Sequence, residues 1–182
     1  MAGSPDFLEE AARIVKALRA LGFGPVLVGG MALVMLGSRR VTRDFDFVVA
    51  EPGERLETLI DVFYARGLEL VSRLNDDGDV VSTIRNKKVA AIRLRLDAPA
   101  SAYFFNPRTG LRVDLLFDFP IPAATLAARA TPTRVGSRLF HVASEEDLLR
   151  LKRIAKAQRS SPGDVQDIAF LVARRKAAKP SR

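Results

Sequence analysis

The sequence predicts a mixed α+β fold, with a mixed sheet flanked by helices and a helical extension at the C-terminal end. Short apolar segments with strand-like alternation, such as 111–117, are interspersed with segments whose apolar residues recur at helical spacing, such as 56–63. Hairpin signals and crossover signals both occur, which is typical of a mixed sheet. The 182 residues, 48% of them hydrophobic, suffice for a core. We expect a core at 1–143, helices that pack on it at 144–176, and a basic tail at 177–182.

The composition limits the classes of function. A formal net charge of +8 and a pI near 10.4 favour polyanionic partners such as RNA, DNA or nucleotides, although the arginine preference of a GC-rich genome would give the same balance. The absence of cysteine excludes disulfides, thiolate catalysis and Cys-ligated zinc, and fits a reducing cytoplasm. Because His141 is the single histidine, a bound metal should be a hard ion held by oxygen ligands.

Neither a membrane span nor an export signal is expected. The apolar runs are too short to cross a bilayer. The N-terminal segment MAGSPDFLEEAARIVKALRA has acidic residues early and lacks the apolar centre of a signal peptide. The sequence therefore predicts a cytoplasmic protein without a membrane partner.

Periodicity and turn residues predict the order of the elements. The expected helices have apolar residues three and four positions apart, and the expected strands are short apolar or alternating segments between turn residues. Ser144 and Asp164 are expected to cap the last two helices, and 121–133 is expected to form a short helix and a loop. The predicted helices are 5–20, 31–36, 56–63, 144–158 and 164–176; the predicted strands are 26–28, 44–49, 68–71, 80–84, 89–96, 111–117 and 138–142.

Three carboxylates occupy the polar faces of two predicted strands. Asp44 and Asp46 are two residues apart, so they project to the same face while Phe45 and Phe47 turn to the core. Asp114 has the same environment in the later strand 111–117. Carboxylates side by side repel one another and require a cation or a proton between them. The pattern therefore predicts a cation-binding carboxylate cluster.

A glycine pair lies between the first predicted strand and the helix that follows it. Gly29 and Gly30 can bring backbone N–H groups close to an anion without a side chain in the way. The loop 38–43 then carries three arginines to the start of the carboxylate strand. A site for an anion beside a site for a cation is typical of proteins that act on nucleotides.

In their order and spacing, these features resemble the nucleotidyltransferase superfamily that shares the fold of DNA polymerase beta. Its pattern is an apolar residue, Gly and Gly or Ser, a helix, Asp-x-Asp or Asp-x-Glu, and an acidic residue on a later strand. The chain has Val28-Gly29-Gly30, Asp44-Phe45-Asp46 and Asp114. The segment VGGMALVMLGSRRVTRDFDFVV is similar to the group that contains the AbiEii-type toxins, in which an Arg and a Thr shortly precede Asp-x-Asp, as Arg40 and Thr42 do here.

The C-terminal part carries a second portion of the resemblance. SEEDLLRLKRIAKAQRSSPGDVQDIAFL matches the ending of AbiEii-type proteins, with Lys152, Asp164 and Asp167 at the charged positions. Altogether the resemblance covers 26–49, 111–118 and 144–171, and the middle of the chain matches none of the family's motifs.

The resemblance implies transfer of a nucleoside monophosphate from an NTP, with two Mg²⁺ ions as cofactors. Asp44 and Asp46 would bridge both ions, and Asp114 would complete the ion nearest the nucleophile. Asp114 would also accept the proton of the acceptor hydroxyl, unless metal polarisation makes this unnecessary. Five further residues are assigned to nucleotide binding: Gly29, Gly30, Arg40, Arg43 and Asp167. Lys152 is assigned to catalysis together with the three carboxylates.

Several of these residues have a structural alternative. The loop arginines Arg40 and Arg43 are solvated surface residues in one interpretation and phosphate ligands in the other. Lys152 either extends to solvent from an apolar helix face or reaches into the cleft. Asp164 is expected to be an N-cap, and Asp167 either completes a capping box with it or holds Lys152 in place.

The leading hypothesis is an Mg²⁺-dependent nucleotidyltransferase that modifies RNA, such as a tRNA 3′ end, as the toxin of a toxin–antitoxin pair. A protein hydroxyl or a small molecule such as an aminoglycoside is an alternative acceptor. A catalytically silent module that binds RNA or a partner protein is the alternative of a different class. A DNA-binding regulator ranks last, because the C-terminal helices lack a helix-turn-helix pattern.

Overall fold

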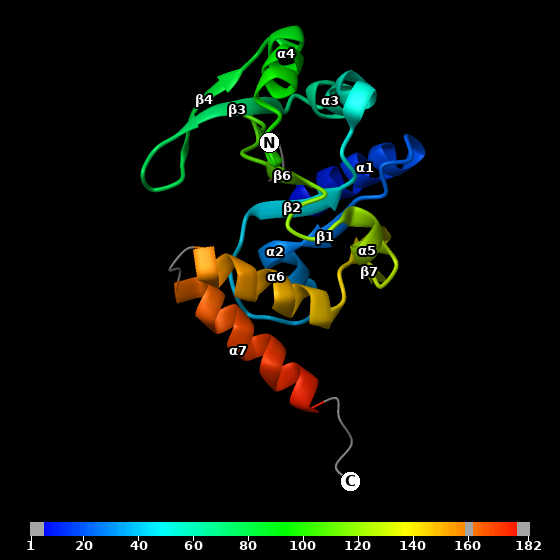
Figure 1. The fold of residues 1–182 in the computed structure, drawn as a ribbon, viewed down its shortest axis with the longest axis vertical. Coiled ribbons are helices and arrows are strands. Elements are labelled where there is room, and N and C mark those ends of the chain that lie inside the picture. Colours follow the sequence, from blue (N-terminus) through cyan, green and yellow to red (C-terminus); the bar gives the residue numbers. More distant parts are fainter. Residues whose placement is uncertain (1–5, 159–161, 178–182) are drawn as a thin grey trace.

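The computed structural model describes residues 6–158 and 162–177 of the 182-residue chain. Within these residues, eight strands form one mixed sheet in the order β4-β3-β5-β6-β2-β1-β8-β7 (Figure 1). The predicted mixed α+β class is therefore confirmed. The strands are β1 Val26–Val28, β2 Asp44–Val49, β3 Glu69–Leu74, β4 Val80–Ile84, β5 Ser101–Phe105, β6 Arg112–Phe117, β7 Thr131–Val135 and β8 Arg138–Val142.

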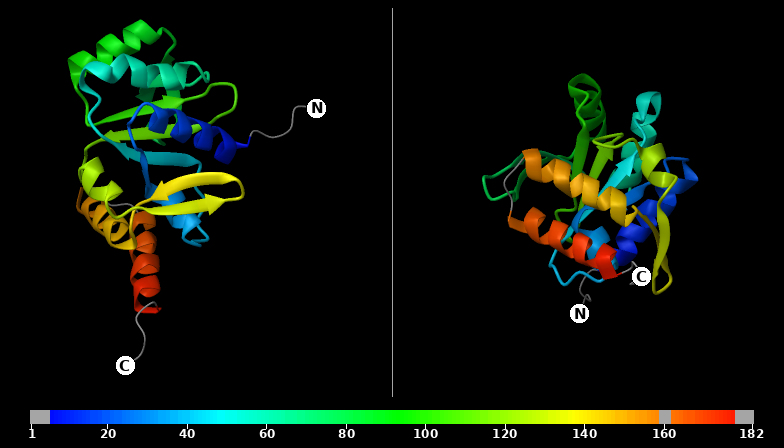
Figure 2. Two further views of the ribbon diagram at one scale, coloured as in Figure 1. Left: turned by 90° about the vertical axis from the view of Figure 1, so that its right-hand side faces the viewer. Right: turned by 60° about the horizontal axis from the view of Figure 1, so that its bottom comes forward.

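Helices lie around this sheet and at its C-terminal end. Helix α1 contacts β8 and α3, and α2 contacts β1 and β2. The last two helices, α6 and α7, pack side by side (Figure 2). The helices are α1 Phe7–Ala20, α2 Gly29–Met35, α3 Leu56–Tyr64, α4 Lys87–Asp97, α5 Ala123–Ala127, α6 Glu145–Gln158 and α7 Pro162–Ala177, with a 3-10 turn at Gly53–Arg55.

The centre of the sheet is formed by β2, which lies between β1 and β6. It is antiparallel to β1 and parallel to β6. Phe45 and Phe47 are buried on one face of β2, and Val113 and Leu115 are buried on the same face of β6. Because side chains alternate along a strand, the acidic residues of both strands project from the opposite face.

The sequence-based assignment of 89–96 as a strand is wrong, because this segment is part of helix α4. Asn86 caps the helix, and its side-chain oxygen accepts hydrogen bonds from the N–H groups of Lys88 and Val89. The apolar alternation of this segment resembles a strand, yet Ile92 is 55% exposed and does not join a buried face. The buried side chains are Ala90, Ala91 and Leu94. Ala, Leu, Lys and Arg are strong helix formers, and this preference decided the local structure.

Two strands were not expected from the sequence. Strand β5 pairs with β6 and β3, and β7 forms a hairpin with β8. The expectation of a helix and a loop over 121–133 is correct for α5 but wrong from Thr131 onward. Neither strand has a strong alternation of its own, so pairing with a neighbour determines the structure.

The remaining predicted elements are present with shifted ends; β3, for example, continues to Leu74. The division of the chain into a core, a helical extension and a tail at 177–182 stays a prediction, and most of that tail lies outside the described residues.

Candidate active site

The three predicted carboxylates come together at the centre of the sheet. The register of the parallel pair β2–β6 places Asp46 beside Asp114, and Asp44 beside Arg112. Neighbouring strands lie about 4.8 Å apart, so side chains in register on one face can contact each other. Asp44, Asp46 and Asp114 line one pocket with a volume of about 360 Å³.

This carboxylate cluster carries negative charge in a largely buried setting. One oxygen of Asp44 and one of Asp114 are buried, and neither has a hydrogen-bond partner among the described residues. Burial, followed by the charges of Asp46 and Asp44, raises the pKa of Asp114 to about 8. The guanidinium of Arg112 lies 4.0 Å from Asp44, beyond hydrogen-bonding distance. The cluster therefore favours a proton or a bound cation.

The donor set suits a hard cation. In the part of the chain that the structure describes, no group of three or more acidic, His or Cys side chains is arranged as a preformed metal site. The fit therefore rests on the chemistry of the donors: three carboxylates, two of which have a buried oxygen that lacks a described hydrogen-bond partner. Oxygen donors of this kind are the ligands that Mg²⁺ prefers.

Gly29 and Gly30 allow two functional side chains to approach the backbone at the start of α2. Gly29 has a φ of +66°, and a Cβ at this position would lie 1.9 Å from Oδ2 of Asp46. A Cβ at Gly30 would lie 2.9 Å from Cζ of Arg40. Only glycine fits at Gly29, for both space and backbone conformation. The glycine pair therefore directly determines the positions of Asp46 and Arg40.

A buried ionic network connects the pocket to α7. Nζ of Lys152 lies 2.7 Å from Asp167 and 3.2 Å from Asp164, and Asp167 also pairs with Arg40. The Lys152 side chain is only 11% exposed and lines the pocket, so it does not extend to solvent. Asp167 holds Lys152 in place, which answers one of the questions left open by the sequence. The expectation that Asp164 is an N-cap is wrong, because it lies within the first turn of α7 and pairs with Lys152.

The two candidate arginines of the loop before β2 differ in position. Arg40 lines the pocket together with Thr42, whereas Arg43 is exposed and is not among the pocket residues. The Nε of Arg40 is buried without a hydrogen-bond partner among the described residues. The structure therefore brings Arg40 into the site and leaves Arg43 outside the pocket wall.

The other half of the pocket is apolar and was not anticipated. It is formed by the ends of β2 and β6, the segment after β6, and one face of α6. Helical spacing along α6 could have indicated part of it, since Leu148, Leu151, Lys152 and Ala155 share a face. The apolar half of the pocket consists of Val48, Leu116, Phe119, Pro120, Leu148, Leu151, Ile154 and Ala155, and Gln158 lies at the end of α6.

Two polar residues beside the carboxylates were also missed. Tyr103 on β5 is in register with Asp114, and burial, followed by the charge of Asp44, raises its pKa to about 12. Arg112 donates a hydrogen bond of 3.2 Å to Asp79 at the turn between β3 and β4. Strand alternation could have indicated Arg112, which is two residues before Asp114. Tyr103 could not be placed, because β5 itself was not predicted.

A protein-family model described as "Nucleotidyl transferase AbiEii toxin, Type IV TA system" matches residues 12–181. The chain belongs to this family. The AbiEii match extends over both glycines, all three carboxylates and the Lys152 network, and it confirms the resemblance found in the sequence. The chain is accordingly a nucleotidyltransferase. A comparison with curated protein sequences gave no match.

Solved structures show that the AbiEii chain has a nucleotidyltransferase fold. ANT(2″)-Ia in complex with adenylyl-2″-tobramycin is 14% identical, with a TM-score of 0.59 over 93% of this chain and 90% of that one. The lincosamide antibiotic adenylyltransferase LnuA, bound to lincomycin, is 14% identical, with a TM-score of 0.56 over 90% and 94% of the chains. The nucleotidyltransferase-family protein TM1012 of Thermotoga maritima is 15% identical, with a TM-score of 0.51 over 85% and 89%.

Proposed function

We propose that the chain transfers a nucleoside monophosphate from an NTP to an acceptor hydroxyl, with Mg²⁺ bound by Asp44, Asp46 and Asp114. The acceptor oxygen forms a bond to the alpha-phosphorus, and pyrophosphate is released. The observation that carries the proposal is the convergence of these three carboxylates, with two buried oxygens that lack described partners, in one pocket. Bound Mg²⁺ would neutralise the carboxylates and stabilise the charge that develops on the attacking and leaving oxygens.

The residues around the carboxylates would bind the nucleotide and handle the proton. Gly29 and Gly30 line the polar end of the pocket, where backbone N–H groups at the start of α2 would bind phosphates. Asp114 would accept the proton of the acceptor hydroxyl, unless polarisation by the metal makes this unnecessary. Because Asp164 and Asp167 already balance the charges of Arg40 and Lys152, these two cations contribute oriented N–H donors rather than a net positive field. Arg43 would act only by reaching in from outside the pocket.

RNA, such as a tRNA 3′ end, is the acceptor that we favour. The net charge of +8 supports a polyanionic partner, and the family is described by the AbiEii toxin of type IV toxin–antitoxin systems. An antitoxin protein is then the expected partner, and the cytoplasm, where NTPs and tRNA are found, is the expected location. Within the described residues, no helix is both long and apolar enough to span a membrane.

A small-molecule acceptor is the second candidate. Two proteins that share the fold are described with antibiotics: ANT(2″)-Ia with an adenylylated tobramycin, and LnuA with lincomycin. A protein hydroxyl, and a silent module that only binds RNA, are the remaining alternatives. The silent module predicts polyanion binding that is unaffected by removal of Mg²⁺ or by Asp46→Ala.

The test is to incubate the protein with each labelled NTP, with Mg²⁺ or EDTA, and with or without total tRNA. We expect Mg²⁺-dependent label on tRNA and its loss in Asp46→Ala, with folding of the variant checked by its melting curve. Label on the protein itself would identify self-modification, and label only on an added aminoglycoside would identify a small-molecule enzyme. The proposal is refuted if the wild type and Asp46→Ala are indistinguishable in every arm.

A further inference from the structure

A basic groove runs along the outer side of α6, on the far side of this helix from the active-site pocket. One section, of about 540 Å³, is bordered by four arginines and two acidic residues: Arg129, Arg150, Arg153 and Arg175, with Glu146 and Asp147. An adjoining section, of about 280 Å³, shares Arg153 and Arg175 and adds Lys176. The two sections therefore form one continuous surface, which we call the α6–α7 groove.

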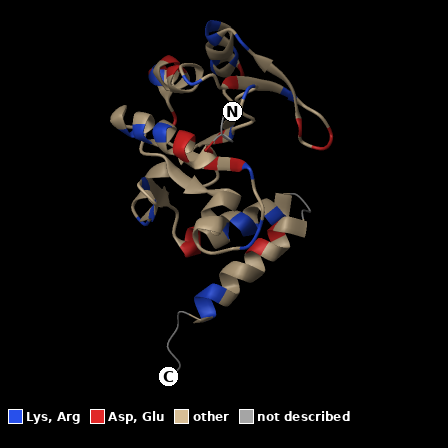
Figure 3. Ribbon diagram, turned by 180° about the vertical axis from the view of Figure 1, so that it is seen from behind, with Lys and Arg blue, Asp and Glu red and all other residues tan. Residues whose placement is uncertain are grey.

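The cations of the α6–α7 groove are largely free to bind an external anion. Arg129 is engaged in a bidentate contact with the buried Asp147. Within the described parts of α6, α7 and the core, Arg150, Arg153, Arg175 and Lys176 form no salt bridge, and all four are exposed. Figure 3 shows Lys and Arg along α6 and at the C-terminal end of α7. The groove therefore carries a net positive charge, with five cations (Arg129, Arg150, Arg153, Arg175 and Lys176) against the two carboxylates of Glu146 and Asp147.

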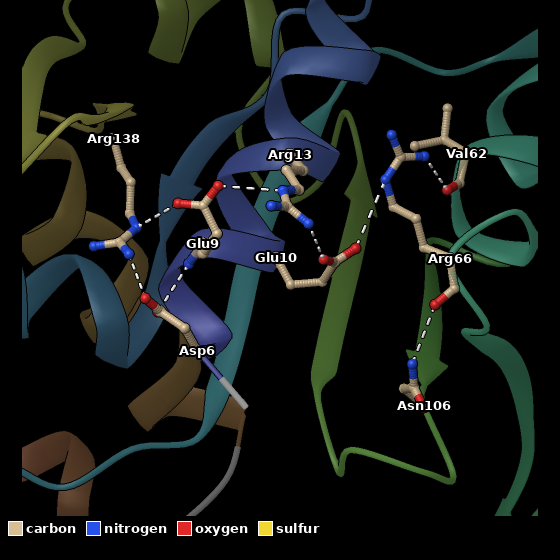
Figure 4. Close-up of polar contacts among 8 residues, drawn as sticks. All are labelled: Asp6, Glu9, Glu10, Arg13, Val62, Arg66, Asn106 and Arg138. Atoms are coloured by element: carbon tan, nitrogen blue, oxygen red, sulfur yellow. Dashed lines mark hydrogen bonds and ion pairs between the residues drawn. The ribbon is translucent and has the colours of Figure 1, made fainter. Parts of the chain in front are cut away.

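The basic residues around the start of α1 are paired to a greater extent than those of the groove. Around the start of α1, Glu9 contacts Arg13 at 3.2 Å and Arg138 at 2.9 Å, and Glu10 contacts Arg13 at 3.7 Å and Arg66 at 3.8 Å (Figure 4). These pairs cancel much of the local field there. Other exposed cations that form no salt bridge among the described residues, such as Arg43, Arg73 and Lys88, lie elsewhere on the surface. What distinguishes the α6–α7 groove is that its cations lie next to the active-site pocket.

The α6–α7 groove is adjacent to the active-site pocket. Ile154 borders both the pocket and the groove, so only the body of α6 separates them. A helix with its side chains is about 10–12 Å across. An RNA strand whose 3′ end enters the pocket can therefore cross α6 and continue in the groove. Helix α7 is held in place by Arg174, which contacts Glu145 at 2.6 Å and the carbonyl of Leu36 at 2.9 Å.

We propose that the α6–α7 groove binds the sugar-phosphate backbone of an RNA acceptor whose 3′ end lies in the active-site pocket. Three of its four cations that form no salt bridge are arginines, whose planar guanidinium groups match phosphate oxygens in bidentate fashion. We favour RNA over an acidic protein segment as the occupant, because the groove adjoins the pocket in which the end of the acceptor reacts. The groove cations can bind successive phosphates, and Leu149, Ile154, Ala157 and Val172 line the space between them. The proposal rests on RNA as the acceptor in the proposed function, and it assigns the surface that holds it.

The test compares two double variants with the same change in charge. Arg153→Glu/Arg175→Glu reverses two groove cations, and Arg85→Glu/Lys88→Glu reverses two exposed cations at the start of α4, at the opposite end of the molecule (Figure 1). Binding of labelled tRNA is measured by fluorescence anisotropy without NTP at several salt concentrations. The KM values for tRNA and for NTP are measured in the transfer assay.

We expect the groove variant to bind tRNA about 100-fold more weakly, from two lost charge-assisted contacts. Its plot of log affinity against log salt should be shallower by about 1.5, since each phosphate contact contributes a slope of about 0.7 to 0.9. The KM for NTP should stay unchanged, and the α4 variant should differ from the wild type by less than about threefold.

Other outcomes separate this inference from the proposed function. Equal losses in both variants, or no loss in the groove variant, would overturn the assignment of the groove. Absence of tRNA binding by the wild type would also overturn it and would leave an acidic protein as the occupant to test. Groove-dependent binding of tRNA without transfer of label would uphold the groove and refute RNA as the acceptor.

Discussion

The substitution Gly29→Ala tests whether the position of the Asp46 carboxylate controls the reaction. The new Cβ would lie 1.9 Å from Oδ2, 2.7 Å from Cγ and 3.0 Å from Cβ of Asp46. Ordinary contact begins at 3.4 Å, so the carboxylate oxygen has to move by about 1.5 Å. A displacement of about 1 Å at a reacting group costs about 100-fold in rate, and we expect at least that loss of nucleotidyl transfer.

The matched control is Gly53→Ala. Gly53 also has a positive φ, +52°, but a Cβ there meets nothing within 4 Å. Both variants should lose about 1–2 kcal/mol of unfolding free energy, because alanine is strained in the left-handed region. Urea unfolding measures this loss, and the labelled-NTP assay measures transfer. If Gly29→Ala retains activity within about threefold of Gly53→Ala, the reasoning about Asp46 is refuted.

Three further predictions concern buried charge. Because the folded-state pKa of Asp114 is raised from 3.8 to about 8, its contribution to stability is complete below about pH 4 and is lost as the pH rises through 8. The measurement is the unfolding free energy of the wild type minus that of Asp114→Asn, in EDTA. This difference should fall by about 2–3 kcal/mol between pH 5.5 and 7.5. A difference that stays constant over this range would contradict the prediction. Lys152→Met should cost about 3–5 kcal/mol by urea unfolding, because it removes the cation that bridges the buried carboxylates of Asp164 and Asp167, of which Asp167 keeps Arg40. Adding Asp164→Asn should restore part of the loss, and no restoration would argue against the pairing. Burial raises the pKa of Asp147, but hydrogen bonds from Arg129 and Ser144 outweigh the effect of burial. The pKa of Asp147 therefore lies below its ordinary value of 3.8. Arg129→Gln should therefore melt below the wild type at pH 7, with the difference shrinking below about pH 4, and a difference independent of pH would count against the ion pair.

Local sequence patterns were sufficient for the elements that carry the site. The spacing of Asp44 and Asp46, between Phe45 and Phe47, determined which side chains share a face of β2. The glycine pair marked the start of α2, and the alternation of 112–117 placed Asp114 on a polar face. These features follow from interactions between residues close in the chain, so they can be predicted without the tertiary structure.

The same local patterns failed where two structures were equally compatible with them. The apolar alternation of 89–96 suited a strand, but helix propensity and the Asn86 cap made it α4. Strands β5 and β7 exist because neighbours pair with them, and their own sequences give little indication of it. As a result Tyr103, which is in register with Asp114, was not predicted as part of the site.

The sequence by itself determined that this chain carries a glycine pair and three carboxylates suited to a nucleotide and a cation. Only the tertiary structure decided that Asp46 and Asp114 are in register, that Arg40 enters the pocket while Arg43 does not, and that Lys152 is held by two carboxylates of α7. The physical reason is the range of the interactions. Periodicity is set by neighbours in the chain, whereas a buried charge takes whichever partner the packing of distant segments brings to it.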